Sequence, residues 1–436
     1  MASKQSLSHI AAPSRLVSVL QNFPPVTYAF AYGSGAHHQP GLYENETSRP
    51  LPSDASLSEG PRADAGPEAS SSSRRDMTNN KSSAIQKINL GKMPSLGAVG
   101  GRSRGPVIDF IFAVEDAHEW HQQNLARNPD HYSWVGRLGA NAICGISEAV
   151  GVGVHFNTLV RLDEQTTIKY GVIEAASLER DLALWESCYV AGRLHKPVRQ
   201  LVAPPPPLAA ALGTNLHNAV AAALVLLPPT FTEEELLRTL VGLSYRGDVR
   251  LAVGAEDPHK VARIVDGSWD ELYGMYLPLL AARAGRYSAL GLEVAGQVEG
   301  EGGSRRGGRL WRQAKDPESQ AAALRLLAPG LLLEMATRLG YHVPIDHLAA
   351  GTTTQREVVE AAMRSGSAQR LAADSLAAIV RRSSIYQAAS GLLAAGGGKA
   401  VQYVGAKVAK ALRPLLATAT TAAGGKVAGT QQARQH

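Results

Sequence analysis

The sequence predicts an α+β protein in which a mixed-sheet domain precedes a mostly helical domain. Short apolar runs typical of strands alternate with helical segments up to about residue 203. Four consecutive prolines, Pro204 to Pro207, then mark a linker, and helical spacing dominates beyond it. We expect four regions: a sheet domain over 1–203, a helical domain over 208–390, a basic amphipathic helix over 391–415 and a disordered tail over 416–436.

The 436-residue chain carries 44 Lys and Arg and 38 Asp and Glu, so its net charge is +6. This modest excess suits an acidic ligand or an anionic membrane surface, and it does not require nucleic acid. The two cysteines, Cys144 and Cys188, give neither a metal-binding spacing nor a disulfide framework, which favours a reducing compartment. The longest uncharged stretch, 200–232, is interrupted by prolines and polar residues. Its apolar part is shorter than the ~20 residues of a spanning helix, so we expect no transmembrane segment.

The first elements are a short helix over 14–22 and a strand that starts at Tyr28. From about residue 41 to about residue 105, Ser, Gly, Pro, Asp and Arg dominate, and we expect a disordered insertion. Residues 107–114 then predict a buried strand. No acid precedes Glu44, which fits either a weak mitochondrial presequence or an ordinary N-terminal helix.

These two strands carry the main candidate site. The first runs into Gly33 and Ser34, and the second contains a single acid, Asp109. A buried, unpaired carboxylate is costly, so this acid needs an explanation. Nucleotidyltransferases build their site in this way. The glycine lets the backbone approach a triphosphate, the serine and free N–H groups hold its oxygens, and the carboxylate holds the magnesium that bridges them.

Further along the sheet domain we expect a helix that starts after Asp116, a hairpin of two strands, and a second helix with Ser177 as its N-cap. Lys169 lies inside the second strand of the hairpin. It either extends to water at a sheet edge or contacts a phosphate. The expected bounds are 117–127, 151–162, 167–175 and 177–194.

Three basic or titratable residues, Arg193, His195 and Lys196, follow the second helix. Clustered cations at this point suit a phosphate ligand. The C-terminus of a helix also attracts cations, because the helix dipole is negative there. Both interpretations stay open from the sequence alone.

The helical domain starts with a helix over 208–227. Thr232 and Glu235 have the spacing of a capping box, so a second helix starts there. Gly247 and Asp248 predict a turn, and 300–308 predicts a Gly- and Arg-rich insertion. Helices resume at Asp316 and continue to the end.

A basic amphipathic helix is expected over 399–413. Four apolar residues three or four apart form one stripe: Val401, Val404, Val408 and Leu412. The cations lie on the opposite face or its flank: Lys399, Lys407, Lys410 and Arg413. Such a helix is typical of a membrane-surface anchor, and the alternative is a terminal helix docked on its own domain.

Taken together, these strings resemble the mitochondrial phosphatidate cytidylyltransferases, the CDP-diacylglycerol synthases also described as translocator assembly and maintenance proteins. Their order and spacing match over most of the chain, apart from the two insertions and both ends. The matching strings are YGSG (32–35), IDFIFAV (108–114), WHQQN (120–124), HYS (131–133), GVHFN (153–157), KYGVI (169–173), AGRLHKPV (191–198), LSYRGDVR (243–250) and IVRRSSIYQ (379–387).

The resemblance implies a nucleotidyltransferase domain, a helical, winged-helix-like domain and a C-terminal helix at the membrane. It implies an enzyme that converts CTP and phosphatidate to CDP-diacylglycerol and pyrophosphate with Mg²⁺, for cardiolipin synthesis. The location implied is peripheral, on the matrix side of the mitochondrial inner membrane and on its anionic lipids. The residues that would carry the site are Asp109 (metal and catalysis), Lys169 (catalysis and nucleotide), and Gly33, Ser34, Arg193 and Lys196 (nucleotide).

Some positions depart from the expected pattern. Many nucleotidyltransferases have a second acid two residues after the first, and Ile111 stands there. A second metal ligand would have to come from elsewhere, and four acids are open candidates: Glu115, Asp116, Asp163 and Glu174. His195 replaces an expected Gln, and Tyr386 replaces an Arg of some members.

Two other functions stay open. One is a nucleotidyltransferase with a soluble or nucleic-acid acceptor. The chain lacks the interleaved aromatic and basic residues of a single-strand platform, so we expect no nucleic-acid partner. The other is a non-catalytic membrane scaffold that maintains a protein import complex.

Overall fold

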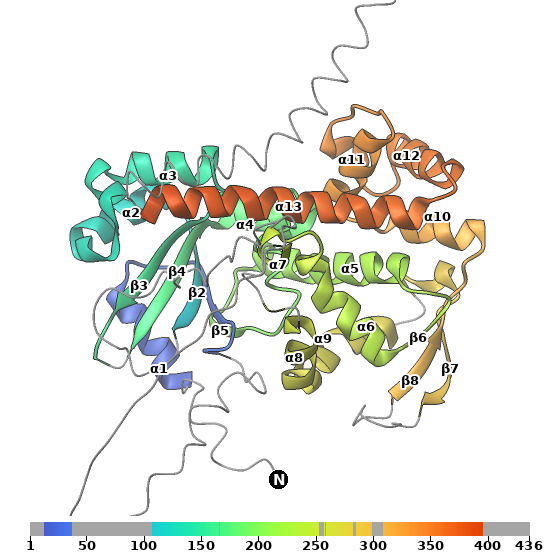
Figure 1. Cartoon of the computed structure of the whole chain (residues 1–436), viewed down its shortest axis with the longest axis horizontal. Helices are drawn as coiled ribbons and strands as arrows, with labels where there is room; N and C mark the ends of the chain where they lie inside the picture. The colour runs from blue at the N-terminus through green and yellow to red at the C-terminus, as the bar shows by residue number, and fades with distance from the viewer. Residues whose placement is uncertain are drawn as a thin grey trace, which may run out of the picture. The chain divides into compact units, whose positions relative to one another are not determined.

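The computed structural model describes residues 13–36, 107–164, 166–252, 257, 259–281, 285–298 and 308–395. They belong to one compact unit, which comprises 1–42 and 103–436. The described residues form a mixed α+β structure with a five-stranded and a three-stranded sheet (Figure 1). The expected insertion over 41–105, the basic helix over 399–413 and the tail after 416 lie outside the described residues.

The five-stranded sheet has the order β3-β4-β2-β1-β5. Strands β2 and β4 are parallel, and the other neighbours are antiparallel. The two strands of the predicted site, β1 and β2, are therefore direct neighbours. The strands are β1 (Tyr28–Tyr32), β2 (Ile108–Val114), β3 (His155–Arg161), β4 (Thr167–Glu174) and β5 (Arg199–Val202).

Strand β2 is apolar almost throughout because both of its faces are covered. Phe110 and Phe112 pack on one face with Trp120 and Tyr170. Ile111 and Ala113 pack on the other face, in a core that continues into the helical half of the chain. Asp109, near the start of the strand, is the one acid in this apolar element.

Helices and 3₁₀ turns cover both faces of the sheet. The predicted helix over 14–22 is present as α1 followed by η1, and α2 has the predicted bounds, with the Asp116 carboxylate accepting from the Glu119 N–H at 2.8 Å. The elements are α1 (Pro13–Ser18), η1 (Val19–Asn22), α2 (Ala117–Arg127), η2 (Pro129–His131), η3 (Trp134–Leu138), α3 (Ala140–Ala149) and α4 (Ala175–Leu184).

The prediction of a helix over 177–194 was wrong at both ends. Helix α4 starts two residues earlier, with Glu174 as its N-cap, and ends at Leu184. Trp185 and Cys188 then have φ of 59° and 51°, in the left-handed region that terminates a helix. The apolar spacing that predicted a longer helix is explained by a compact, buried loop instead.

The helical half adds the remaining elements. The capping box of Thr232 and Glu235 is confirmed at the start of α6. The elements are α5 (Pro206–Leu226), β6 (Thr230–Thr232), α6 (Glu233–Gly242), η4 (Leu243–Tyr245), α7 (Val249–Ala252), α8 (Lys260–Gly267), α9 (Trp269–Ala281), η5 (Ser288–Leu290), β7 (Glu293–Val298), β8 (Gly308–Arg312), α10 (Pro317–Arg325), α11 (Pro329–Arg338), η6 (Ile345–Leu348), α12 (Thr353–Arg364) and α13 (Ala368–Ala395).

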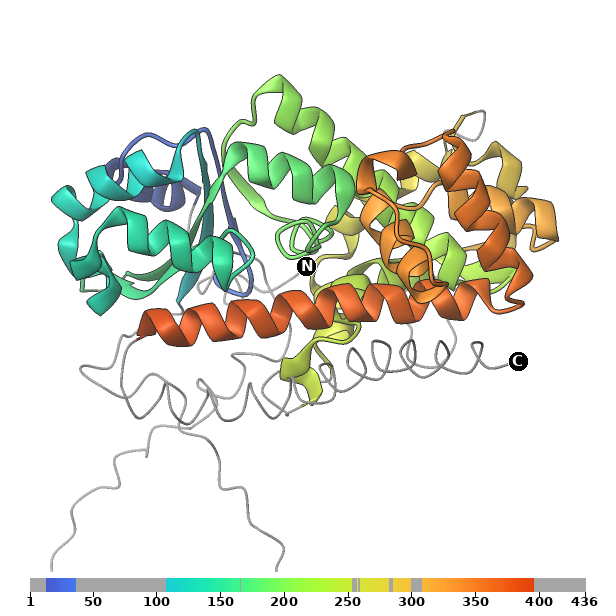
Figure 2. The same cartoon turned by 90° about the horizontal axis from the view of Figure 1, so that it is seen from above.

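Two features of this half were not predicted. Strands β6, β7 and β8 form a small antiparallel sheet, and the Gly- and Arg-rich segment connects β7 to β8. Helix α13 has 28 residues and runs from α11 past α5 and α7 to β3 and α3, as the view from above shows (Figure 2). It therefore packs on the helical half and on the sheet at the same time.

Helix α5 is long and apolar enough to cross a membrane by length and composition. Its most apolar window is 56% buried in the protein, and the helix packs on α4, α6, α10 and α13. This is the environment of a core helix. One apolar core includes residues before and after the proline run, so the core does not test whether a domain boundary lies there. The expected division into domains therefore stays a prediction.

Candidate active site

Asp109 and Lys169 are brought together by the pairing of the central strands. The parallel register of β2 with β4 places them side by side, and Lys169 Nζ lies 3.4 Å from Asp109 Oδ1. Burial alone would lower the pKa of Lys169, but Tyr32 and Asp109 raise it overall, so the side chain stays protonated. Lys169 belongs to an interior strand, which argues against the interpretation as a snorkelling edge lysine.

The glycine-serine turn reaches the same place. Tyr32 pairs with Asp109 in the antiparallel register of β1 with β2, and the chain turns immediately after it. Gly33 has φ of +77°, and a Cβ atom there would lie 3.4 Å from Asp109 Oδ2. The left-handed conformation favours glycine at this position.

A cavity of about 420 Å³ opens beside this pair. It lies between the sheet, the loop after α4 and the helical half, with one wall formed by α13. All six residues predicted for the nucleotide and the metal line it: Gly33, Ser34, Asp109, Lys169, Arg193 and Lys196. The structure thus gathers them at one cavity, while their individual roles stay predictions.

Arg193 and Lys196 are held by specific contacts. The Arg193 guanidinium donates to the Tyr189 carbonyl (2.9 Å) and hydroxyl (2.8 Å) and lies 3.9 Å above the centre of the Tyr189 ring. Lys196 Nζ donates to the Gly192 carbonyl and to Ser244 Oγ, both at 2.6 Å. These contacts fix both cationic groups at the cavity wall.

His195 does not join the cations around it. Its ring is buried against Trp185, and its Nε2 lies 3.2 Å from Asn215 Oδ1. Burial, with Lys196 beside it, lowers the pKa of His195 to about 3, so the ring is neutral. Its neighbour Lys196 is affected in the same way, because burial and the nearby Arg193 lower the pKa of Lys196 to about 7.

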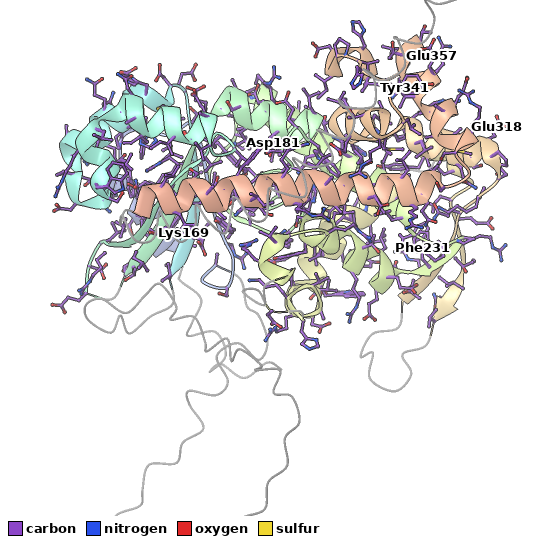
Figure 3. All side chains as sticks on the ribbon, turned by 45° about the horizontal axis from the view of Figure 1, so that its top comes forward. Lys169, Asp181, Phe231, Glu318, Tyr341 and Glu357 are labelled. Atoms are coloured by element: carbon purple, nitrogen blue, oxygen red, sulfur yellow. The ribbon has the colours of Figure 1, made fainter. Side chains whose placement is uncertain are left out.

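The loop that carries these cations is held by one buried acid, Asp181. Asp181 lies on α4 and is labelled in Figure 3. Its carboxylate accepts five hydrogen bonds of 2.8–3.1 Å from the loop. The donors are the N–H groups of Ser187, Cys188, Val190 and Ala191, and Ser187 Oγ. The carboxylate takes the place of the carbonyl acceptors that a helix would provide. It satisfies N–H groups of the loop that would otherwise lack partners.

The helical half contributes residues that the sequence analysis did not assign. Arg250 and Lys260 add cations to the cavity wall, and Arg250 pairs with the buried Asp248 at 2.6 Å. Gln387 on α13 also lines the cavity. Arg250 and Gln387 belong to two of the quoted strings, 243–250 and 379–387. Their local sequence spacing did not predict that they would reach the cavity.

The donor set suits a magnesium ion that is bound mainly through its substrate. Asp109 is the predicted ligand, and no group of three or more His, Cys, Asp or Glu able to hold a metal occurs among the described residues. The candidate second ligands Glu115, Asp116, Asp163 and Glu174 do not line the cavity. Asp248 does, but it is paired with Arg250. One carboxylate with phosphate oxygens and water is a usual environment for Mg²⁺.

Behind the sheet, opposite the Lys169 face of β4, lies a buried polar network around Tyr170. Its hydroxyl meets Asn124 Nδ2 (3.0 Å), Asn157 Nδ2 (2.8 Å) and His131 Nδ1 (3.1 Å). The Tyr132 hydroxyl meets Asn124 Nδ2 and His121 Nδ1. Four of the quoted strings, 120–124, 131–133, 153–157 and 169–173, meet here. The contacts hold Tyr170 of β4 in place, and the residue before it, Lys169, lines the cavity.

This network predicts a loss of stability in acid. Burial lowers the pKa of His155 to about 4, and burial also lowers the pKa of His121. Below pH 6.5 the unfolded chain binds more protons than the folded one, so the free energy of unfolding falls until about pH 4. The His155 shift alone corresponds to about 3 kcal/mol. Urea unfolding across this range should show the loss.

The matched variants for this measurement are His155→Asn and His118→Asn. The first removes one of the buried titrating groups and should make the dependence on pH less steep. The second removes an exposed histidine from helix α2 and should leave the dependence almost unchanged. Equal slopes for all three proteins would mean that the buried ring does not cause the acid sensitivity.

A glycine-serine turn beside a strand acid, facing a cavity with several cations, defines a nucleotidyltransferase-type site. Comparison with known proteins agrees with this class. Residues 16–410 match the family model described as phosphatidate cytidylyltransferase, mitochondrial. The chain belongs to this family.

Several relatives carry the same description. The Drosophila melanogaster protein is 38% identical over 306 residues, which cover 69% of this chain and 83% of that protein. The Xenopus laevis protein is 36% identical over 314 residues, which cover 72% and 85%. The Danio rerio protein is 36% identical over 318 residues, which cover 73% and 87%.

Proposed function

We propose that this cavity transfers the cytidylyl group of CTP to phosphatidate and releases pyrophosphate. A phosphate oxygen of phosphatidate attacks the α-phosphorus of CTP, and the bond from that phosphorus to the β-phosphate bridging oxygen breaks. The products are CDP-diacylglycerol and pyrophosphate. The observation that carries the proposal is the position of Asp109, which lies beside Gly33 and Lys169 at the wall of one cavity.

Positioning and charge neutralisation account for the chemistry required. Gly33 and Ser34 hold the leaving phosphates, and Lys169 neutralises charge beside them. Asp109 would hold Mg²⁺, which supplies charge neutralisation of the triphosphate when it is bound. Phosphatidate is already an anion near neutral pH, so its attack needs no strong general base.

Arg193 interacts electrostatically with residues from both parts of the cavity. Lys169 and Tyr32 belong to the sheet, and Arg250 belongs to the helical half. This position suits the reacting phosphates, because the α-phosphate of CTP and the phosphate of the acceptor must meet there. Lys196 and Arg250 then neutralise the incoming phosphate of the lipid.

The pKa of Lys196 predicts how activity depends on pH. In the free enzyme it is about 7, so at higher pH the amine must take up a proton before it can pair with an anion. We expect KM for the anionic substrates to rise from about pH 7 to about pH 9, by up to about tenfold per pH unit. The Lys196→Arg variant stays charged and should show a flatter profile. A wild-type profile as flat as that of the variant would contradict this role.

The relatives' names indicate a mitochondrial location. Within the organelle, we place the enzyme peripherally on the matrix face of the inner membrane, where CDP-diacylglycerol enters cardiolipin synthesis. The helix expected over 399–413 supports this placement, because its cations suit anionic lipids.

Charge reversal tests the membrane contact. The variant with Lys399→Glu, Lys407→Glu, Lys410→Glu and Arg413→Glu should no longer float with liposomes that contain anionic lipids, because repulsion replaces about 1 kcal/mol of attraction per cation. The control replaces the three lysines by arginine and should float like the wild type. Unchanged flotation of the glutamate variant would reject this helix as the anchor.

The decisive experiment is an assay with purified protein, labelled CTP, phosphatidate and Mg²⁺. Labelled CDP-diacylglycerol is the expected product. Soluble phosphate acceptors and single-stranded nucleic acid, added as competitors, should not reduce its formation. Transfer to a soluble acceptor alone would favour the other nucleotidyltransferase activity, and no transfer to any acceptor would favour a scaffold.

A further inference from the structure

A second, mostly apolar groove of about 290 Å³ lies next to the cation-lined cavity. Two half-buried leucines on α5, Leu212 and Leu216, are four residues apart and form one wall. Met275 on α9 and Val198 before β5 face them, and Tyr28 of β1 contributes to the lining. Gln200 of β5 also lines the groove, so two strands of the sheet and two helices of the helical half build it together.

The groove and the cavity share two lining residues, Lys196 and Pro197. The Lys196 amine donates to Gly192 and Ser244, and both of these residues line the cavity. The charged end of the side chain thus faces the cavity, and the remainder of the residue borders the groove. A lysine with an apolar stem and a charged tip commonly separates an apolar surface from a polar one in this way.

We propose that this groove holds one acyl chain of the phosphatidate acceptor while its phosphate lies in the cavity at Lys196. This inference rests on the proposed function and adds a lipid subsite to it. The ligand has an anionic head joined to an apolar tail, and the chain offers a cationic cavity joined to an apolar groove across one lysine. The charged and apolar parts therefore follow each other in the same order in the ligand and in the protein.

The acid in the groove lining argues against an anionic occupant. Glu271 lines the groove, where its ion pair with Arg199 measures 3.2 Å. A carboxylate at this place would repel a phosphate, so the anionic head is directed to the cavity. Met275 suits a flexible hydrocarbon chain, because its unbranched side chain adapts to irregular apolar shapes.

The test compares water-soluble acceptors that differ in chain length. With CTP and Mg²⁺, the wild type should use dioctanoyl phosphatidate better than dibutyryl phosphatidate by at least about tenfold in kcat/KM, since each buried methylene contributes a factor of about four. Leu216→Trp fills the groove and should reduce this ratio to about one. KM for CTP and turnover of the dibutyryl substrate should change less than about twofold.

Leu333→Trp is the matched control, because this half-buried leucine on α11 lines neither the groove nor the cavity. It should keep the wild-type ratio. Met275→Trp fills the groove from the opposite wall and replaces Leu216→Trp if that variant does not fold. A wild-type ratio near one, or an unchanged ratio in a folded groove variant, would overturn the proposal.

A labelling experiment gives a readout that does not need turnover. Phosphatidate with a diazirine at the end of an octanoyl chain should crosslink to peptides that contain Leu212, Leu216 or Met275. Crosslinks only to other parts of the chain would also overturn the groove assignment. Failure of the proposed function would look different, because no acceptor of any chain length would then receive the cytidylyl group.

Discussion

Asp109→Asn is expected to lower kcat for cytidylyl transfer by about a thousandfold or more, with the fold retained. The amide is of the same size and still fits beside Gly33 and Lys169. It cannot supply the negative charge that holds a divalent cation against the triphosphate. Turnover with labelled CTP and phosphatidate measures the effect, and circular dichroism with thermal unfolding shows whether the fold is kept.

Glu115→Gln is the control for this substitution. Glu115 is an exposed acid just past the other end of the same strand, and it does not line the cavity. Its variant should turn over at the wild-type rate. If Asp109→Asn also kept its rate, the carboxylate would have no part in the reaction, and the nucleotide site would have to be sought elsewhere.

Asp181→Ala is expected to lower the free energy of unfolding by about 3 kcal/mol or more and to remove most activity. The substitution leaves four N–H groups of the loop over 187–191 without their acceptor, and three of them are buried. That loop leads directly to Arg193 and Lys196, so their positions at the cavity are lost with it. Urea unfolding and the transferase assay measure the two effects.

Two further variants separate this effect from a general sensitivity of α4. Asp181→Asn keeps one oxygen acceptor and should lose less stability than the alanine variant. Ser177→Ala changes an exposed residue of the same helix that does not cap it, so its stability should stay within about 0.5 kcal/mol of the wild type. A loss near 1 kcal/mol at Ser177 would instead indicate a cap at that residue.

The sheet half of the fold could be predicted because its signals are local. A few neighbouring residues are enough to predict the apolar strand around Asp109 and the glycine-serine turn. The same is true of the start of the helix after Asp116. Their assembly at one cavity also follows from the strands, since a polar residue in a buried strand must face something polar. Lys169 is recognised for the same reason.

The loop after α4 could not be predicted from local pattern. Its apolar spacing fits a helix, and the chain departs from helical geometry at Trp185, without a glycine or proline to mark the place. The cause is a tertiary one: the Asp181 carboxylate offers the backbone a set of hydrogen bonds that a helix would not use.

The contribution of the helical half to the cavity is non-local as well. Arg250, Lys260 and Gln387 reach the site through tertiary packing, because α13 packs on β3 and α3, α7 packs on α13, and α8 packs on α6. Their own segments have ordinary helical spacing. Strands β7 and β8 were missed because the short strands flank a Gly- and Arg-rich segment that dominates the composition of the region.

The pairing of β1 with β2 has a practical consequence. The chain leaves the sheet after Tyr32 and re-enters it at Ile108, and Gly35 lies directly against Val107 and Ile108. The residues that flank the long intervening segment are therefore held next to each other by the pairing of β1 with β2. This makes the segment a suitable place to graft a fluorescent reporter or to splice in a short turn, because neither change alters the separation of the two strand ends.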